Sequence, residues 1–387
     1  MSSNVTTITG DSQTLRSDSG LLSELRLTTA PPFSERRELP RTPFITVVIP
    51  VRNEAKSIGN VLNQLLSQDY PANRFELIVA DGESTDETVP VVMEIAERHN
   101  NVRLYANPRR WSSAGRNIGV RQARGDIVVV VDGHCELADD QYLRDLADAF
   151  RTTGADCVGR PQPQDVSDAN AFQCAVAAAR SSRLGHHPDS HIYSSKERFV
   201  PAISVGVAYR RHVFEELGGF DERFDACEDV EFNYRADRAG FRCYFTPSVS
   251  VHYRPRGNLR GLFRQLARYG RGRVRLFRKH PETLSLKSFL PGLFVLGCII
   301  GPGLAWLSTW LLRVYLGAIL TYVLIVLATS VVIAIRQRKL AVLSWLPLVF
   351  LAIHLGAGAG MLVEAICGAR QSSDSDAPLA ARPSTHA

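Results

Sequence analysis

Runs of continuous apolar residues alternate with amphipathic helical patterns over the first half of this chain. The apolar runs, which are rich in β-branched residues, cover 44–51, 77–80, 102–105 and 127–131. The helical patterns between them cover 57–68, 87–98 and 114–124. Strands without polar alternation are buried on both faces, which requires a parallel sheet covered by helices on each side. The sequence therefore predicts an α/β domain with a mostly parallel sheet.

The pattern is weaker in the second half of this domain. A helix is expected over 171–180 and a strand over 202–209, whereas 181–199 is polar, contains three histidines and is expected to be a loop. A further helix over 230–239 and a strand over 242–245 are expected to complete the domain.

Acidic residues directly follow two of the apolar runs, and a third acidic pair lies further along the chain. The segments are Asp81-Gly82-Glu83-Ser84-Thr85-Asp86, Asp132-Gly133-His134 and Glu228-Asp229. The carboxyl ends of parallel strands meet at one edge of the sheet, where open α/β sheets bind their ligands. Because a nucleotide, a divalent metal and an acid/base step all use such groups, the pattern indicates an enzyme that handles nucleotides.

Three long apolar stretches, 289–307, 314–335 and 343–363, lie near the end of the chain. Each is close to the roughly 20 residues that an apolar helix needs to cross a bilayer. The basic loop Arg336-Gln337-Arg338-Lys339 is predicted to be cytoplasmic by the positive-inside rule. We therefore expect a multi-pass protein of the cell (inner) membrane with its α/β domain in the cytoplasm. The glycine-rich third stretch would leave the C-terminus outside, or would be re-entrant.

The segment before the first apolar stretch is strongly basic, in a chain of net charge +6. Between Arg254 and Lys279 there are ten basic residues and no acidic residue. The spacing predicts a helix over 261–279 with arginines on one face and leucines on another. Its position beside a membrane span favours anionic lipid head groups as partners over nucleic acid, so the helix is expected in the membrane interface. A solvated helix on the domain surface is the alternative.

The remaining composition sets the expected organisation of the chain. Seven cysteines without C-x-x-C spacing argue against a disulfide framework or a zinc site and favour a reducing compartment. Both ends are polar and are predicted to be disordered. The predicted segments are a tail over 1–43, a catalytic domain over 44–258, a basic interfacial helix over 259–288, a transmembrane region over 289–368 and a tail over 369–387.

Five motifs, in this order, resemble those of family-2 inverting glycosyltransferases. They are 47–54 (Val-Val-Ile-Pro-Val-Arg-Asn-Glu), 81–86, 114–119 (Ala-Gly-Arg-Asn-Ile-Gly), 132–134 and the pair 228–229. The resemblance covers residues 44 to 280, and the Asp-Gly-His variant is most similar to the succinoglycan-biosynthesis type. It implies a GT-A fold, a Rossmann-like nucleotide-diphospho-sugar transferase domain. It also implies transfer of a hexose from a nucleotide sugar, expected to be a UDP-sugar, to a lipid-linked saccharide in exopolysaccharide biosynthesis.

The resemblance also implies which residues bind the donor: Pro50, Val51, Asn53, Glu54, Asp81, Ser84, Arg116, Asn117 and Asp132. The Asp81 carboxylate can accept the uracil N3–H, although Asp-Gly is also a common turn. Arg116, expected at a helix start, can reach phosphate oxygens, or is a surface arginine.

A divalent cation, Mg²⁺ or Mn²⁺, is implied at Asp132, where the family usually has Asp-x-Asp. His134 takes the place of the second aspartate, and because imidazole suits Mn²⁺ better than Mg²⁺, Mn²⁺ is favoured. A hydrogen-bonded turn histidine is the alternative. His252 follows the strand-like residues 248–251 and would approach the diphosphate or the metal, or be a core histidine.

The same resemblance implies that Asp229 is the general base and that Glu228 orients it or binds the acceptor. Acidic residues at a helix start also act as caps. Gln265, Arg268 and Tyr269 resemble the motif that closes the acceptor site of processive synthases, with Tyr in place of Trp, and an aromatic ring can stack on a sugar. Two alternatives therefore stay open: a processive β-glycan synthase, for which three spans are few, and a catalytically dead protein that binds nucleotide sugars.

Overall fold

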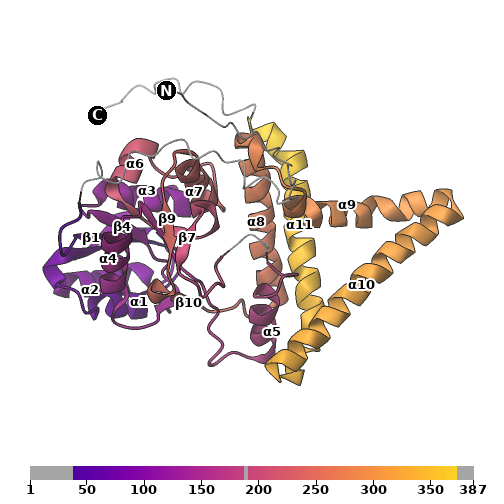
Figure 1. The fold of residues 1–387 in the computed structure, drawn as a ribbon, viewed down its shortest axis with the longest axis horizontal. Helices are drawn as coiled ribbons and strands as arrows, with labels where there is room; N and C mark the ends of the chain where they lie inside the picture. The colour runs from indigo at the N-terminus through magenta and orange to yellow at the C-terminus, as the bar shows by residue number, and fades with distance from the viewer. Residues whose placement is uncertain (1–37, 187–190, 373–387) are drawn as a thin grey trace, which may run out of the picture.

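The computed structural model describes residues 38–186 and 191–372 of the chain. The tails predicted over 1–43 and 369–387 lie almost entirely outside these residues. The α/β domain stands on one side of two long neighbouring helices, α8 (Leu259–Lys279) and α11 (Leu346–Ser372) (Figure 1). On the other side, α9 (Leu286–Leu307) and α10 (Thr309–Gln337) project away and meet at a far tip.

The α/β domain is built on an eight-stranded sheet with the order β3-β2-β1-β4-β8-β6-β9-β7. Its strands are β1 (Ile45–Val51), β2 (Phe75–Asp81), β3 (Val102–Ala106), β4 (Ile127–Val130), β6 (Cys157–Gly159), β7 (Arg198–Val200), β8 (Gly206–Arg210) and β9 (Cys243–Phe245). The four predicted apolar runs form the parallel half, β3-β2-β1-β4. Strand β8 runs antiparallel to β4 and β6, and β7 runs antiparallel to β9, so the sheet is mixed but mostly parallel as predicted.

Two expected strands begin later than predicted because each is preceded by a turn of 3₁₀ helix. Residues Ala202–Ser204 form such a turn before β8, and Pro247–Val249 form another before β10 (Val251–Tyr253). Strand β10 pairs with β5 (Cys135–Leu137) in a separate two-stranded sheet. Because β5 comes shortly after Asp132, this small sheet brings β10 to the acidic edge.

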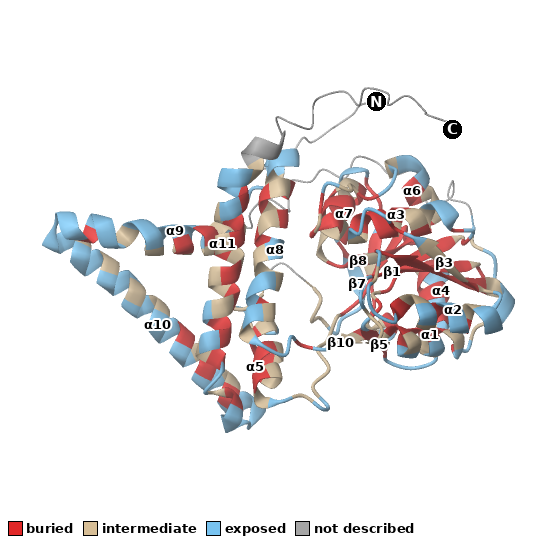
Figure 2. Cartoon of the chain, turned by 180° about the vertical axis from the view of Figure 1, so that it is seen from behind, coloured by how far each residue is buried: buried red, intermediate tan, exposed pale blue. Residues whose placement is uncertain are grey.

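Helices cover both faces of the main sheet, and Figure 2 shows the buried strands between them. The helices on the sheet are α1 (Ile58–Leu66), α2 (Thr88–Arg98), α3 (Ser112–Gln122), α4 (Tyr142–Thr153), α6 (Arg211–Leu217) and α7 (Glu228–Arg238). Helix α5 (Ala171–Arg180) leaves the sheet and packs against α8 and α11 (Figure 1). In β1, Val47 and Ile49 pack on the side of α1 and α4, and Val48 packs on the side of α3. A Cβ atom on Gly119 of α3 would lie only 2.2 Å from Val48 Cγ1, so this glycine lets α3 sit directly on the sheet.

Three of the C-terminal helices are long and apolar enough to cross a membrane: α9, α10 and the segment Leu346–Gly368 of α11. They match the predicted stretches, with ends that differ by a few residues. Only 17% of the most apolar window of α9 and of α10 is buried, against 44% for α11. Helix α11 is therefore packed more extensively against the rest of the protein than α9 and α10 are.

The leucine face of α8 contacts protein. Leu262 is fully buried in a cluster with Phe350 and Ile353 of α11. Arg260 and Arg264 lie exposed on α8. The amphipathic pattern thus predicts the helix correctly, but α11 covers its apolar face.

Candidate active site

The ends of β1 and β2 bring two predicted donor-binding segments together. Val51 lies opposite Asp81 in the parallel register. Beyond the strands, the backbone N–H of Asn53 donates to Ser84 Oγ (2.8 Å), and Asn53 Oδ1 accepts from the N–H of Thr85 (2.8 Å). The two loops therefore form one unit at the edge of the sheet.

Asp81 itself forms the turn that follows β2. The Ser84 hydroxyl donates to Asp81 Oδ1 (2.5 Å), and the Ser84 N–H donates to Oδ2 (3.0 Å). Asn53 and Glu83, on either side, have left-handed backbones with φ of 57° and 56°. The turn interpretation of Asp81 is confirmed, and recognition of a base by the same carboxylate stays a prediction.

Asp132 lies just beyond β4, which is the other parallel neighbour of β1. The Tyr253 hydroxyl donates to Asp132 Oδ2 at 2.7 Å. Burial acts to raise the pKa of Asp132, but His134, Arg116 and the Tyr253 hydrogen bond hold it below its ordinary value. The carboxylate is thus kept ionised at the sheet edge, as a cation-binding group requires.

His134 is held by the predicted donor-binding residue Glu54. Its Nδ1 atom lies 2.9 Å from Glu54 Oε1, and this hydrogen bond raises the pKa of His134 against the effect of burial. The Ser57 hydroxyl donates to the other oxygen of Glu54 (3.1 Å). The hydrogen-bonded alternative for His134 is therefore confirmed, and metal binding by this residue stays a prediction.

His252 does not join Asp132. It precedes Tyr253 on β10, and neighbouring side chains on a strand point to opposite faces. Tyr253 reaches Asp132, whereas His252 lies opposite Glu136 in the ladder with β5. The prediction that His252 approaches the metal is corrected, because the side chain one residue later occupies that place.

The acidic edge of the sheet fits a divalent cation that is also coordinated by a bound substrate. Within residues 38–186 and 191–372, no group of three or more His, Cys, Asp or Glu side chains is arranged to hold a metal ion. Asp132 and His134 are the groups predicted from the sequence to hold the cation. Since Mg²⁺-type sites in nucleotide enzymes commonly use one or two carboxylates together with substrate phosphates, these residues fit a cation shared with a diphosphate.

Arg116 links this edge to the third acidic segment. It lies in the second turn of α3, almost buried, with Nη2 3.3 Å from Glu228 Oε1 and its guanidinium 5.4 Å from the centre of the Phe220 ring. Although burial opposes the charge, Glu228, Asp229 and Asp132 raise the pKa of Arg116. The surface-arginine interpretation and the placement at the helix start are both wrong. Arg116 is instead the cation between the acidic groups.

Asn117 is placed differently from the prediction. Its Nδ2 atom donates to the Phe220 carbonyl and to Glu222 Oε1 (both 2.8 Å), and its Oδ1 accepts from the Phe220 N–H (2.7 Å). The amide is therefore occupied by the loop before α7 and holds that loop on α3. This corrects the assignment of Asn117 to the donor.

Glu228 and Asp229 form the first turn of α7. Cys227 before them has a left-handed backbone (φ 64°), which turns the chain sharply into the helix. Glu228 is 5% exposed, and burial and the neighbouring Asp229 raise its pKa although Arg116 opposes this. Asp229 Oδ1 accepts only a local hydrogen bond, from the N–H of Val230 (2.8 Å). Of the two carboxylates, Glu228 is thus the one bound to Arg116.

The predicted closing motif on α8 lies against this turn. Arg268 donates to the Asp225 carbonyl, and the Tyr269 carbonyl lies 3.8 Å from Cys227 Sγ. Gln265 Nε2 donates to the Tyr269 hydroxyl (3.3 Å), and the Tyr269 ring is 38% exposed. The structure therefore brings Gln265, Arg268 and Tyr269 to the segment that carries Glu228 and Asp229.

Arg160 is a buried cation near Asp132 that sequence reasoning missed. It is 1% exposed, and it donates to the Tyr142 hydroxyl (2.6 Å) and to the Val130 carbonyl (3.3 Å). Its Nε atom is buried without a hydrogen-bond partner. Arg160 is one of the charges that lower the pKa of Asp132. No local signal marks this residue, because its place depends on the order of the strands.

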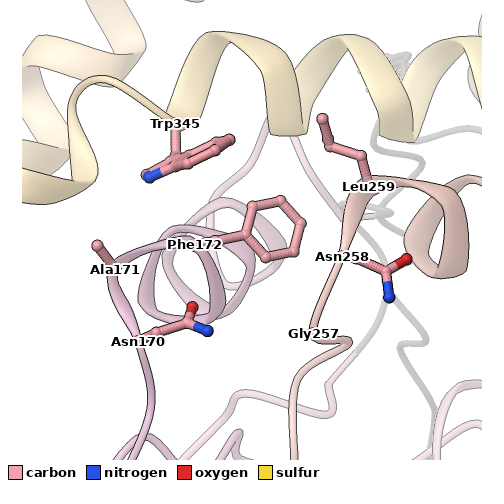
Figure 3. A pocket seen from close by; sticks show the side chains of 7 residues that line it. All are labelled: Asn170, Ala171, Phe172, Gly257, Asn258, Leu259 and Trp345. Carbon is pink, nitrogen blue, oxygen red and sulfur yellow. The ribbon is translucent and has the colours of Figure 1, made fainter.

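A separate pocket of about 450 Å³ lies between the starts of α5, α8 and α11 (Figure 3). Phe172, Leu259 and Trp345 give it an apolar lining. It contains none of the predicted site residues, so it belongs to the junction of the domain with the apolar helices.

Comparisons with known proteins agree with the motifs. The sequence model described as "Glycosyltransferase like family 2" matches residues 40–272. Succinoglycan biosynthesis protein ExoA of Rhizobium meliloti (strain 1021) is 34% identical over 281 residues, which cover 71% of this chain and 83% of that protein. Dolichyl N-acetyl-alpha-D-glucosaminyl phosphate 3-beta-D-2,3-diacetamido-2,3-dideoxy-beta-D-glucuronosyltransferase of Methanococcus voltae is 26% identical over 288 residues, covering 72% of this chain and 85% of that protein.

A solved structure shares the fold. Mannosyltransferase PcManGT from Pyrobaculum calidifontis, in complex with GDP-Man and Mn²⁺, superposes with a TM-score of 0.52 and covers 85% of this chain and 91% of that chain. The sequence identity between the two is 21%. This similarity bears on the fold alone.

Proposed function

Because the chain belongs to glycosyltransferase family 2 and has the GT-A fold, we propose that it moves a hexose from a UDP-sugar to a lipid-linked saccharide at the cytoplasmic face of the cell membrane. It is a glycosyltransferase, and its relatives include enzymes of polysaccharide and lipid-linked saccharide biosynthesis. The donor, the acceptor, the inverting outcome and the membrane face are the proposed part.

The observation that carries the proposal is the chain of charges from Asp132 through Arg116 to Glu228 and Asp229. On its one side, the loop unit of Pro50, Val51, Asn53, Glu54, Asp81 and Ser84 would hold the base and ribose. On its other side, α7 and the closing motif on α8 would meet the acceptor. The donor and the acceptor would then bind on two sides of one charged centre.

The proposed reaction is a single in-line displacement. Asp229 takes the proton of the acceptor hydroxyl, and that oxygen attacks the anomeric carbon from the face opposite the departing diphosphate, which inverts the configuration. Glu228 is held by Arg116, which leaves Asp229 as the base. Asp132 and His134 would hold a divalent cation, with Mn²⁺ favoured, and this ion would neutralise the charge of the diphosphate.

Membrane attachment follows from the helices beyond residue 285. Large apolar side chains are exposed along α9 and α10, including Leu304, Trp306 and Leu320. The exposed Arg260 and Arg264 of α8, with the basic loop after α10, suit anionic lipid head groups. The acceptor would then meet the site at the membrane surface.

A processive β-glycan synthase is the second candidate. The position of Gln265, Arg268 and Tyr269 beside the Glu228-Asp229 turn favours it, since this motif resembles the closing motif of such enzymes. The two functions share their chemistry and differ in the length of the product.

The test uses the full chain in membranes with Mn²⁺, a panel of UDP- and GDP-sugars and lipid-linked saccharide acceptors. We expect release of UDP from one UDP-sugar and addition of one sugar to the acceptor. A ladder of long products would support the processive alternative. Binding of UDP without release of nucleotide from any donor would contradict the enzyme and support the catalytically dead alternative. Release of GDP only would correct the proposed nucleotide.

Arg160→Met is predicted to weaken metal-dependent binding of UDP. The substitution removes the buried charge that lies near Asp132 while keeping an apolar side chain of similar length. The pKa of Asp132 should rise, and the loss of a buried positive charge should weaken the attraction of the sheet edge for the anionic diphosphate. The Kd for UDP with Mn²⁺ should therefore increase about tenfold. Titration calorimetry of the full chain in detergent measures this Kd.

The control for Arg160→Met is Arg98→Met, which removes an exposed arginine from α2. It should leave the Kd unchanged. A Kd for Arg160→Met equal to that of the wild type, in a protein that melts at the same temperature, would show that Arg160 gives Asp132 no support.

A further inference from the structure

The third apolar helix, α11, contacts the α/β domain or α8 at its beginning, its middle and its end. At its start, Trp345 packs edge-on against Phe172 of α5, with ring centres 5.5 Å apart (Figure 3). In the middle, His354 Nε2 lies 3.0 Å from the carbonyl oxygen of Leu184. Near the end, Glu364 accepts two hydrogen bonds from Arg275 of α8, at 3.0 and 3.1 Å. No long part of α11 is therefore free to stand alone in lipid.

Helices α8 and α11 also run parallel at very short distance. A Cβ atom on Gly360 of α11 would lie 2.0 Å from the Ala267 carbonyl oxygen of α8. A Cβ atom on Gly270 of α8 would lie 2.0 Å from the Ala357 carbonyl oxygen of α11. Further on, Arg278 donates to the Ala365 carbonyl at 3.0 Å. The contacts advance along both helices together, so the two axes share one direction. Both views show the two helices side by side (Figures 1 and 2).

The positive charge of α8 limits how the helices α8 and α11 can be oriented in a bilayer. A helix that crosses the hydrocarbon needs about 30 Å of apolar length, and each arginine at its centre costs at least about 2.5 kcal/mol. If α11 crossed the bilayer, its parallel partner α8 would be drawn in with all its arginines, and α5 would follow. The packing of α11 on α8 therefore excludes an upright α11.

The opposite face of α11 is suited to lipid. Leu348, Leu351, Val363 and Ile366 are between 37% and 72% exposed. The start of α9 packs against the middle of α11, where Gly358 lies against Pro291, and the end of α10 leads into the start of α11. Both helices extend away from α8 (Figures 1 and 2). The exposed side chains of α11 are thus continuous with the exposed apolar surface of α9 and α10. One occupant explains all three surfaces, namely the acyl chains of a bilayer.

We propose that α11 lies flat in the membrane interface between α8 and the acyl chains, and that only α9 and α10 cross the bilayer. At about 1.5 Å per residue, α9 and α10 are about 33 and 43 Å long, enough for one crossing each. The chain then crosses twice, and its C-terminus lies on the side of the α/β domain. This inference concerns the membrane topology and does not depend on the activity.

The same arrangement ties the membrane helix to the acidic turn. Arg275, which binds Glu364 of α11, also donates to Asp225 Oδ1. Asp225 precedes the Glu228-Asp229 turn by three residues. If α11 lies flat, these contacts hold the turn that carries Asp229, the proposed general base, at a fixed distance from the bilayer.

The test places a short protease-cleavage site at one of three points in the full chain: before Met1, at Ser308 between α9 and α10, or after Ala387. Each tagged chain is expressed in bacterial membranes, which are then prepared in both orientations and treated with protease from outside. We expect the sites at Met1 and Ala387 to be cut in one orientation and the site at Ser308 in the other. The site before Met1 is the internal marker for the side of the α/β domain.

Two results would overturn the proposal. If the site after Ala387 is cut together with the Ser308 site, α11 crosses the bilayer and the chain has three spans. If all three sites are cut in the same orientation, α9 and α10 do not cross. Both results are independent of sugar transfer, so they leave the proposed function untouched.

Discussion

Asp229→Asn is expected to reduce sugar transfer about a thousandfold while the affinity for UDP stays nearly unchanged. A positioned general base typically contributes about 10² to 10⁴ in rate, and the amide cannot take the acceptor proton. The change is isosteric, and the carboxylate makes only a local hydrogen bond to the N–H of Val230, which the amide oxygen can also accept. Initial rates of UDP release at saturating donor, together with the Kd for UDP and Mn²⁺, measure the two effects separately.

The control for this prediction is Glu216→Gln, an equally small change at an exposed carboxylate of α6. It should leave both the rate and the Kd unaltered. Glu228→Gln is a second comparison, because it leaves the buried Arg116 without its closest carboxylate and should lower the melting temperature. If Asp229→Asn weakens UDP binding as much as it slows transfer, Asp229 is structural and the assignment of the base fails.

The parallel half of the fold could be predicted because its signal is local. Strands β1, β2 and β4 are buried on both faces, so each is a continuous apolar run that needs no knowledge of its neighbours. The start and the antiparallel direction of β8 could not be predicted, since they depend on how the chain returns after α5. The short strands β5 and β10 are stabilised mainly by pairing with each other, and only the folded domain brings them together.

The candidate site also contains residues that the sequence predicts and residues that it does not. The acidic groups at strand ends follow from the register of parallel strands, so Asp81 and Asp132 were placed at one edge from sequence alone. Arg160 and Tyr253 were missed because they reach Asp132 from elements that pair far along the chain. The contact of Arg116 with Glu228 could not be predicted, since the close fit of Gly119 on Val48 helps to set the depth of α3. Binding of the donor phosphates by Arg116 stays a prediction.

Hydropathy alone could not distinguish α11 from the two helices before it. A helix that crosses a bilayer and one that lies between a domain and lipid are both apolar over most of their surface. The distinguishing contacts join α11 to partners about ninety residues or more away, as in the pair of Glu364 with Arg275. The available signal was a single charged residue, Glu364, directly after the apolar stretch 343–363. Its role depends on Arg275, the partner that the fold brings to it.

Asp132→Ala is expected to remove the dependence of donor binding on the divalent cation. Asp132 is the carboxylate at the edge that is kept ionised by His134, Arg116 and Tyr253, and it fits a cation shared with the diphosphate. With Mn²⁺ present, the Kd for UDP should rise at least about a hundredfold, since losing a direct ligand should cost no less than the upper end of the range for an outer-shell partner. With a chelator present, wild type and variant should bind UDP with similar, weak affinity.

Asp132→Asn separates the charge from the shape in this experiment. The amide oxygen can still accept the hydrogen bond of the Tyr253 hydroxyl, so the packing around β10 should survive while the negative charge is lost. The Kd in Mn²⁺ should then match that of Asp132→Ala, and Asp168→Ala, a change at an exposed carboxylate, should behave like wild type. A variant at Asp132 that keeps the full difference between Mn²⁺ and chelator would place the cation elsewhere. The charged centre that joins donor and acceptor in this enzyme would then have to be built without Asp132.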